Sequence, residues 1–107
     1  MISMDTVRQF VLSLPGTEEY DHFGKPAFRA NQRIFSTLWL PEQRVMVKLS
    51  LIDQSVFCAF DPSVIYPVPN KWGLHGYTLF DLSRTRQDML EDALTTAWQA
   101  AVEKRKK

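Results

Sequence analysis

The sequence predicts an α+β fold: an antiparallel β-sheet (meander) packed on one face by N- and C-terminal helices plus a short middle helix. Three observations predict this class. Apolar residues recur at helical spacing near both ends of the chain, strand-like segments separated by turn residues fill the middle, and one short helical segment interrupts these strands. Strands grouped between terminal helices are typical of α+β proteins, and we expect the second face of the sheet to be partly open to water.

The first element is a helix whose apolar stripe has the spacing i, i+3, i+4, i+7. The stripe consists of Val7, Phe10, Val11 and Leu14. Ser3 or Asp5 is expected to cap its start, since short polar side chains accept hydrogen bonds from free backbone N–H groups. Pro15-Gly16 ends it, because proline cannot continue a helix and glycine accepts the left-handed conformation that often follows one.

The next segments alternate like strands. Glu18–Phe23 alternates weakly and is separated by Gly24–Pro26 from a second strand, Ala27–Ala30. Asn31–Arg33 predicts a tight hairpin, since asparagine accepts a positive φ. A third strand, Ile34–Leu40, has apolar residues on both faces, which leaves open the face on which its tryptophan lies.

A second turn, Pro41–Gln43, precedes the most regular strand, Arg44–Leu49. Alternation in this strand places every second residue on the core side and the others on a half-exposed side. The core-side residues are Val45, Val47 and Leu49, and the half-exposed ones are Arg44, Met46 and Lys48.

A short helix is expected from Ser50 to Phe60, with Ser50 as its cap and Asp53 in place of the usual Glu or Gln of a capping box. Its predicted buried stripe is Ile52, Val56, Phe57 and Phe60, and Asp61-Pro62 ends it. The proline-rich segment Ser63–Pro69 is expected to be an extended loop or edge segment.

A further strand, Gly76–Leu82, leads to the last helix, which Ser83 or Thr85 is expected to cap. Apolar residues recur through this helix every three to four positions. They are Met89, Leu90, Ala93, Leu94, Ala97, Trp98, Ala101 and Val102. The basic residues Lys104–Lys107 follow, at the end where cations complement a helix dipole.

The chain has 107 residues, which fit a single domain over 1–107, and 45% of them are hydrophobic, enough for a core. Its one cysteine, Cys58, excludes an internal disulfide, and we interpret it as a small buried hydrophobe rather than a nucleophile. No basic segment followed by an apolar run opens the sequence, and no stretch approaches about 18 uninterrupted apolar residues. We therefore expect a cytoplasmic protein that does not enter a membrane.

The positive charge of the chain is concentrated in its middle. The net charge is +1, but the segment from Gly24 to Lys48 holds five basic residues against one acidic residue, Glu42. The pI of about 7.9 is below the value above 9 that is typical of nucleic-acid-binding domains. The basic residues of this segment either contact phosphates or form a solvated strand face.

Residue patterns for catalysis, cofactors and metals are missing from the sequence. The four glycines lie at scattered turns rather than in a phosphate-binding loop, and His22, His75 and Cys58 are far apart for a metal site. The adjacent carboxylates Glu18-Glu19 are more typical of a solvated face than of an acid/base pair. The prediction is a protein that is not an enzyme and needs no cofactor or metal.

The segment Lys71–Gly76 has the composition of a binding loop. Two glycines allow close backbone approach, and a tryptophan offers a stacking face beside a lysine and a histidine. Alternatively Trp72 seals the edge of the core and His75 bonds the backbone of the loop.

Several short segments, in the order in which they occur, resemble the MmcQ/YjbR family of small bacterial proteins. They are Leu14–Glu19, Gly24–Arg29, Arg33–Phe35, Val47–Leu49, Tyr66-Pro67, Lys71–Gly73, Gly76–Thr78, Asp81-Leu82, and Ala97-Trp98 ahead of Lys104-Arg105. The resemblance covers nearly the whole chain and implies a CyaY-like fold. It also implies DNA binding by a "double wing" of β-hairpins, with no catalytic residues to transfer. Where the family often has Gly-Lys, this chain has Gln32-Arg33, which keeps the charge but not the glycine.

Two functional hypotheses follow from these observations. The first is weak, salt-sensitive binding of double-stranded DNA, with basic hairpin wings on the phosphates. The nucleic-acid-binding candidates are Lys25, Arg29, Arg33, Arg44, Lys48, Lys71, Trp72 and His75. The second is a protein- or small-ligand-binding module that uses the Trp72/His75 loop and the open sheet face. An exposed edge strand could also pair two copies, so the sequence leaves both a monomer and a homodimer open.

Overall fold

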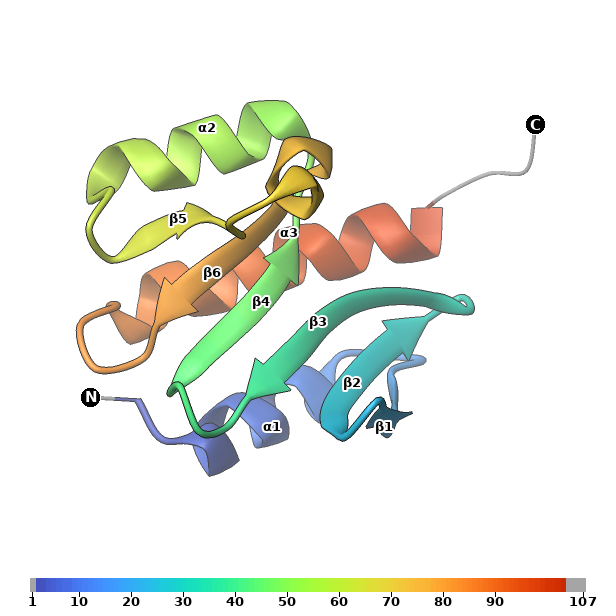
Figure 1. Cartoon of the computed structure of the whole chain (residues 1–107). Helices are drawn as coiled ribbons and strands as arrows, with labels where there is room; N and C mark the ends of the chain where they lie inside the picture. The colour runs from blue at the N-terminus through green and yellow to red at the C-terminus, as the bar shows by residue number, and fades with distance from the viewer. Residues whose placement is uncertain (1, 104–107) are drawn as a thin grey trace.

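A six-stranded antiparallel sheet forms the frame of the computed structural model, which describes residues 2–103 (Figure 1). Its strands lie in the order β1-β2-β3-β4-β6-β5, so the first four form a meander and β5 is an edge strand. Their bounds are β1 Glu18–His22, β2 Lys25–Ala30, β3 Arg33–Trp39, β4 Arg44–Lys48, β5 Ile65–Pro67 and β6 Tyr77–Asp81. The predicted α+β class and the predicted meander are confirmed.

Three α-helices and one short 3₁₀ helix complete the chain: α1 Met4–Ser13, α2 Leu51–Phe60, η1 Lys71–His75 and α3 Gln87–Glu103. The side chain of Ser3 accepts from the Thr6 N–H and that of Ser50 from the Asp53 N–H, which confirms both predicted caps. Within residues 2–103 no helix is both long and apolar enough to cross a membrane. The basic residues Lys104–Lys107 lie outside the described part of the chain.

The main core lies between one sheet face and the helices. Val45, Val47 and Leu49 are buried there, as their alternation predicts, against apolar residues of α1 and α3. At one end of this layer the indole N–H of Trp98 donates to the carbonyl oxygen of Pro15, 2.8 Å away, and so joins α3 to the end of α1. Among the described residues, the opposite face of the sheet carries no α-helix and is bordered only by the short helix η1 (Figure 1); it is called the open face below.

Two hairpin turns are built from residues with positive φ. The turn between β2 and β3 is Asn31-Gln32, with φ of 54° and 63°, so the predicted hairpin forms although its second residue is glutamine rather than glycine. The turn between β1 and β2 is Phe23-Gly24, with φ of 54° and 86°. A sequence with phenylalanine at the first position of such a turn is unusual, because its Cβ crowds the backbone there.

Three sequence-based expectations were wrong. Gly24–Pro26 does not lie wholly between the two strands, because Lys25 and Pro26 already belong to β2. Proline is tolerated there because β2 pairs with β3 only from Ala27 onward, so no hydrogen bond to β3 requires an N–H at Pro26. Neither Ser83 nor Thr85 caps α3, because the helix starts at Gln87 and is directly preceded by Arg86; their hydroxyls donate to oxygens of Asp81.

The third error concerns α2, whose apolar side chains are mostly exposed. This helix lies beside the edge strand β5, and only Gln54 and Phe57 are buried. Ile52, Val56 and Phe60, predicted to be a buried stripe with Phe57, are 78%, 53% and 65% exposed. A helix at the edge of a sheet contacts the core along a narrow strip, so a few side chains on one side of the helix are enough to cover that strip.

Candidate ligand-binding groove on the open sheet face

The open face carries a small apolar cluster of its own. Strand pairing places Thr37 beside Met46 and Met46 beside Leu79, and Val68 closes the row. Met46, Val68 and Leu79 are each less than 9% exposed, although no α-helix covers them. Aromatic side chains around the row shield it instead, namely Trp39, Tyr66 and Tyr77. Trp39 therefore lies on the open face, which the sequence left undecided.

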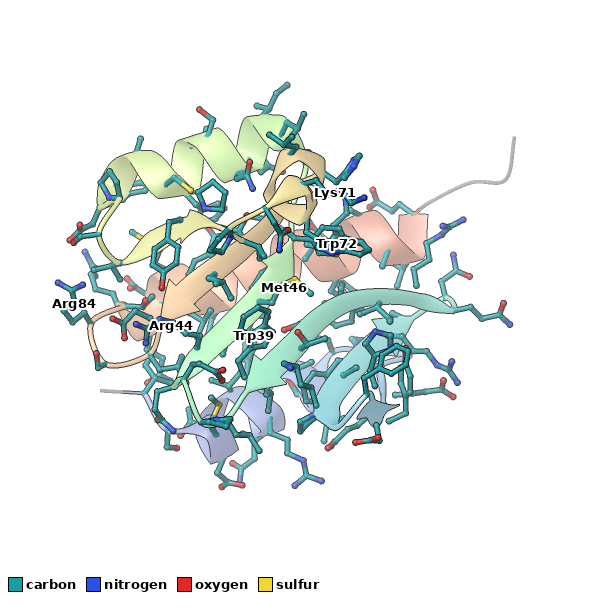
Figure 2. All side chains as sticks on the ribbon, in the orientation of Figure 1. Trp39, Arg44, Met46, Lys71, Trp72 and Arg84 are labelled. Atoms are coloured by element: carbon teal, nitrogen blue, oxygen red, sulfur yellow. The ribbon has the colours of Figure 1, made fainter. Side chains whose placement is uncertain are left out.

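A groove of about 500 Å³ lies on this face. Its floor includes Thr37, Met46 and Val68, and its sides are formed by rings and one ammonium group: Phe23, Lys25, Trp39, Trp72 and Tyr77. We call it the aromatic groove. Figure 2 shows Trp72, Met46 and Trp39 following one another across the open face.

The two most exposed rings of the groove lie on the same face of the sheet but come from segments at its two ends. Phe23, at the β1–β2 turn, is 91% exposed and touches His22 edge-on, with 4.7 Å between ring centroids. Trp72, in η1, is 53% exposed and stands edge-on to Tyr77 at 5.3 Å. Both rings are thus available to a ligand that enters between them.

Close backbone packing holds the η1 side of the groove in place. A Cβ at Gly73 would lie 2.3 Å from the Val68 carbonyl oxygen, and one at Gly76 would lie 1.8 Å from that of Leu49. Only glycine allows these approaches. The buried Gln54 amide donates to the Gly73 carbonyl oxygen at 3.0 Å and so ties η1 to α2.

Two lysines lie over aromatic rings of this face. The Lys25 Nζ is 5.3 Å from the ring centroid of Trp39, and the Lys48 Nζ is 5.4 Å from that of Tyr77. Tyr77 also lines a neighbouring cavity of about 460 Å³, together with Lys48 and Arg33. Positive charge therefore lies beside the groove at two points, close to rings that can stack.

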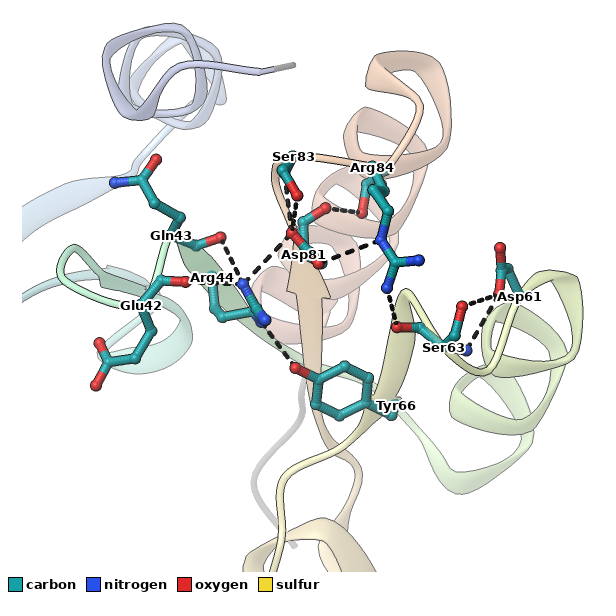
Figure 3. Close-up of polar contacts among 10 residues, drawn as sticks. Glu42, Gln43, Arg44, Asp61, Ser63, Tyr66, Asp81, Ser83 and Arg84 are labelled. Carbon is teal, nitrogen blue, oxygen red and sulfur yellow. Dashed lines mark hydrogen bonds and ion pairs between the residues drawn. The ribbon is translucent and has the colours of Figure 1, made fainter.

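Two of the predicted arginines are held by acidic partners. Arg29 Nε lies 3.0 Å from Glu18 Oε1, and its guanidinium stacks on Tyr20, with 4.6 Å to the ring centroid. Arg44 Nε donates to the Tyr66 hydroxyl at 2.7 Å, and Arg44 Nη1 lies 3.4 Å from Asp81 Oδ1 (Figure 3). The hydrogen bond to Tyr66 raises the pKa of Arg44, which stays charged but already paired.

The carboxylate of Asp81 is the centre of this network. Ser83 donates to it through N–H and hydroxyl, and Arg84 Nε lies 3.6 Å from its other oxygen (Figure 3). Burial raises the pKa of Asp81, but the Ser83 hydrogen bonds and the charges of Arg44 and Arg84 outweigh burial and leave the pKa below its ordinary value. The network joins β4, β5 and β6, which is a structural role.

The other predicted site residues are dispersed. Arg33 is exposed directly after the β2–β3 turn, whereas Arg44 follows the β3–β4 turn, so the two arginines lie at opposite ends of β3. Lys71 and His75 are exposed in η1 and do not line the aromatic groove. Of the eight predicted residues, Lys25 and Trp72 line it and Lys48 adjoins it.

Sequence reasoning missed Phe23, Met46 and His22 as parts of the groove. Phe23 directly in front of glycine, at the end of the predicted strand Glu18–Phe23, was the available signal. Elsewhere, burial raises the pKa of the Cys58 thiol, in agreement with a hydrophobic rather than a nucleophilic role. Among residues 2–103 no three His, Cys, Asp or Glu side chains gather as a metal-ligand set.

Comparison with known proteins identifies the family. The family model named YjbR matches residues 12–100. The chain belongs to the YjbR family. Its fold is similar to the crystal structure of Deinococcus radiodurans protein DR2400, which is described as having a DUF419 domain. The TM-score is 0.84 at 17% sequence identity, over 97% of this chain and 81% of that one. A search of curated proteins found no match.

Proposed function

We propose that this YjbR-family protein binds nucleic acid on the open face of its sheet, and that it is a cytoplasmic binding protein rather than an enzyme. One observation carries the proposal: Phe23 and Trp72 border a single groove that also contains Lys25, with Lys48 beside it. Exposed rings stack on bases and lysines neutralise phosphates, which is the combination that single-strand-binding surfaces use.

The exposed rings of the groove favour a single strand over a duplex. Bases inside a duplex are stacked on each other, and their faces are not accessible to Trp72 or Phe23. The duplex-binding wings expected from the sequence are less well supported. Arg29 and Arg44 are paired with Glu18 and Asp81. Arg33 begins β3, whereas Arg44 lies in β4 beside the other end of β3.

The direct test is fluorescence anisotropy with a labelled oligothymidine of about twelve nucleotides and with a duplex of equal length. We expect the single strand to bind more tightly. If Lys25, Lys48 and Lys71 each neutralise one phosphate, affinity should fall about 20-fold between 50 and 200 mM salt.

Matched variants separate the groove from the rest of the surface. Trp72→Ala and Phe23→Ala should each weaken binding roughly 5- to 160-fold, since stacking contributes about 1–3 kcal/mol per base. Phe60→Ala removes a 65% exposed ring outside the groove and should have no effect. For the cations, Lys25→Gln should weaken binding, whereas Arg86→Gln, which breaks only an exposed pair with Asp88, should not.

Other results would point elsewhere. Preference for the duplex, abolished by Arg33→Glu with Arg44→Glu, would favour the hairpin wings. No binding of either oligonucleotide at low salt would refute the nucleic-acid role. The apolar floor of Met46, Val68 and Leu79 would then favour the second candidate, an uncharged small ligand or peptide in the same groove. Quenching of tryptophan fluorescence that Trp72→Phe removes would detect it.

A further inference from the structure

The outward face of α2 is mostly apolar and carries no charged side chain. Ile52, Val56 and Phe60 follow one another at i, i+4 and i+8, and Leu51 adds a fourth exposed apolar side chain. Small residues, Ser55 and Ala59, occupy the remaining exposed positions of this face. A helix that covers a core normally presents several charged residues to water, whereas this helix has only Asp53, which is partly exposed.

We call this surface the α2 face, and its size is comparable to that of functional patches on other proteins. The row from Ile52 to Phe60 extends for about 12 Å along the helix. Its exposed side chains together present on the order of 500 Å² of apolar surface, a size at which a patch on a monomer is often functional. It lies at the β5 edge of the sheet, and none of its exposed apolar residues lines the aromatic groove.

We propose that the α2 face binds a second copy of this chain, with the two α2 helices antiparallel about a two-fold axis near Val56. Such an arrangement places Ile52 of each chain opposite Phe60 of the other and Val56 opposite Val56. Ser55 and Ala59 are small enough for the helices to approach closely.

Charge and area both favour a second copy over other occupants. The exposed residues of the α2 face are uncharged, so a partner needs no opposite charge to match them. An uncharged apolar surface is the best complement, and the α2 face of a second copy is such a surface. Two copies would together bury at most about 1,000 Å², the lower limit for a specific interface, which predicts a weak, reversible dimer. A membrane surface fits poorly, because α2 contains Asp53 and no basic residue.

The decisive experiment uses charge at the proposed axis. Sedimentation velocity of the full chain from about 1 to 300 µM should show a shift from 12.4 kDa toward twice that mass. Val56→Asp and Val56→Lys should each raise the dissociation constant roughly 100-fold or more, because like charges would meet at the axis. An equimolar mixture of the two variants should recover the dimer, which only pairing of position 56 with itself explains.

Leu12→Asp is the matched control, since Leu12 is a 40% exposed apolar residue of α1, away from α2. It should dimerise like the unmodified chain, and circular dichroism should show that all variants are folded. A monomer at every concentration would overturn the proposal, as would a dimer that Val56→Asp leaves intact. Both outcomes are independent of nucleic-acid binding, which the groove variants test separately.

Discussion

Replacing Gly76 by alanine should destabilise the protein far more than the same change at Gly16. Gly76 has a φ of +96°, and an added Cβ would lie 1.8 Å from the carbonyl oxygen of Leu49. Its own carbonyl oxygen accepts from the Leu49 N–H at 2.9 Å, so the chain cannot move away without breaking that bond. The clash thus lies at the point where η1 joins β6 and meets the end of β4.

The size of the loss follows from its parts. The left-handed conformation costs a non-glycine residue about 1 kcal/mol, and the broken Leu49 hydrogen bond about 1 kcal/mol more. Displacing η1 also disturbs the packing of Gly73 against Val68, which brings the expected loss to about 3–4 kcal/mol. Gly16 has a φ of +76° with nothing within 4 Å of the added Cβ, so Gly16→Ala should lose only about 1 kcal/mol.

Urea unfolding followed by circular dichroism measures both variants, and an unchanged m-value would show that the comparison is valid. Equal losses at the two glycines would refute the reasoning, because they would mean that the Leu49 contact relaxes freely. Since η1 carries Trp72, Gly76→Ala should also weaken oligonucleotide binding, which Gly16→Ala should leave unchanged.

Four further predictions concern stability and use the same unfolding assay. Gln32→Gly should stabilise the protein by about 0.5–1 kcal/mol, since φ is +63° there, and no gain would mean that Gln32 is unstrained. Phe23→Asn should stabilise it by a similar amount and weaken oligonucleotide binding. Phe80→Ala, in the core, should cost about 3–5 kcal/mol, against less than about 0.5 kcal/mol for the exposed Phe60→Ala; similar costs would contradict the position of α2. Asp81→Asn should cost about 1–3 kcal/mol at neutral pH. Because the Asp81 pKa is lowered on folding, its contribution is present above the ordinary value of about 3.9 and disappears as pH falls through the folded-state pKa, so the two proteins should converge in acid.

Much of the fold could be predicted because local chemistry determined it. The alternation of Arg44–Leu49 identified its core face, and Asn31 marked a turn that its positive φ confirms. The bulge at Phe35 could not be foreseen. Pairing shifts between Phe28 and Arg29, so that both Phe35 and Leu38 reach the core, and no local pattern encodes which residue a partner strand skips.

The site was harder to predict, because it depends on which residues the sheet brings side by side. Charge alone pointed to Arg29 and Arg44, yet the acids that pair with them, Glu18 and Asp81, are remote in sequence and adjacent only across strands. Met46 joined Val68 and Leu79 in the same way. The predicted buried stripe of α2 was wrong for a different reason. At the edge of a sheet, the number of helix side chains that are buried depends on how much sheet surface lies beside the helix, and the apolar periodicity of the helix does not report this.

Phe23 supports the case that the open face is selected for binding rather than for stability. A two-residue hairpin turn is best served by asparagine before glycine, and phenylalanine in its place has a strained φ of 54°. Burial could repay that strain, but the ring is 91% exposed and touches only its neighbour His22 among the aromatic contacts of the described residues. The fold alone therefore gains nothing from this side chain. A ligand that stacks on the ring would recover the cost on binding, and this is the exchange expected at functional sites, where local strain and exposed apolar surface occur together.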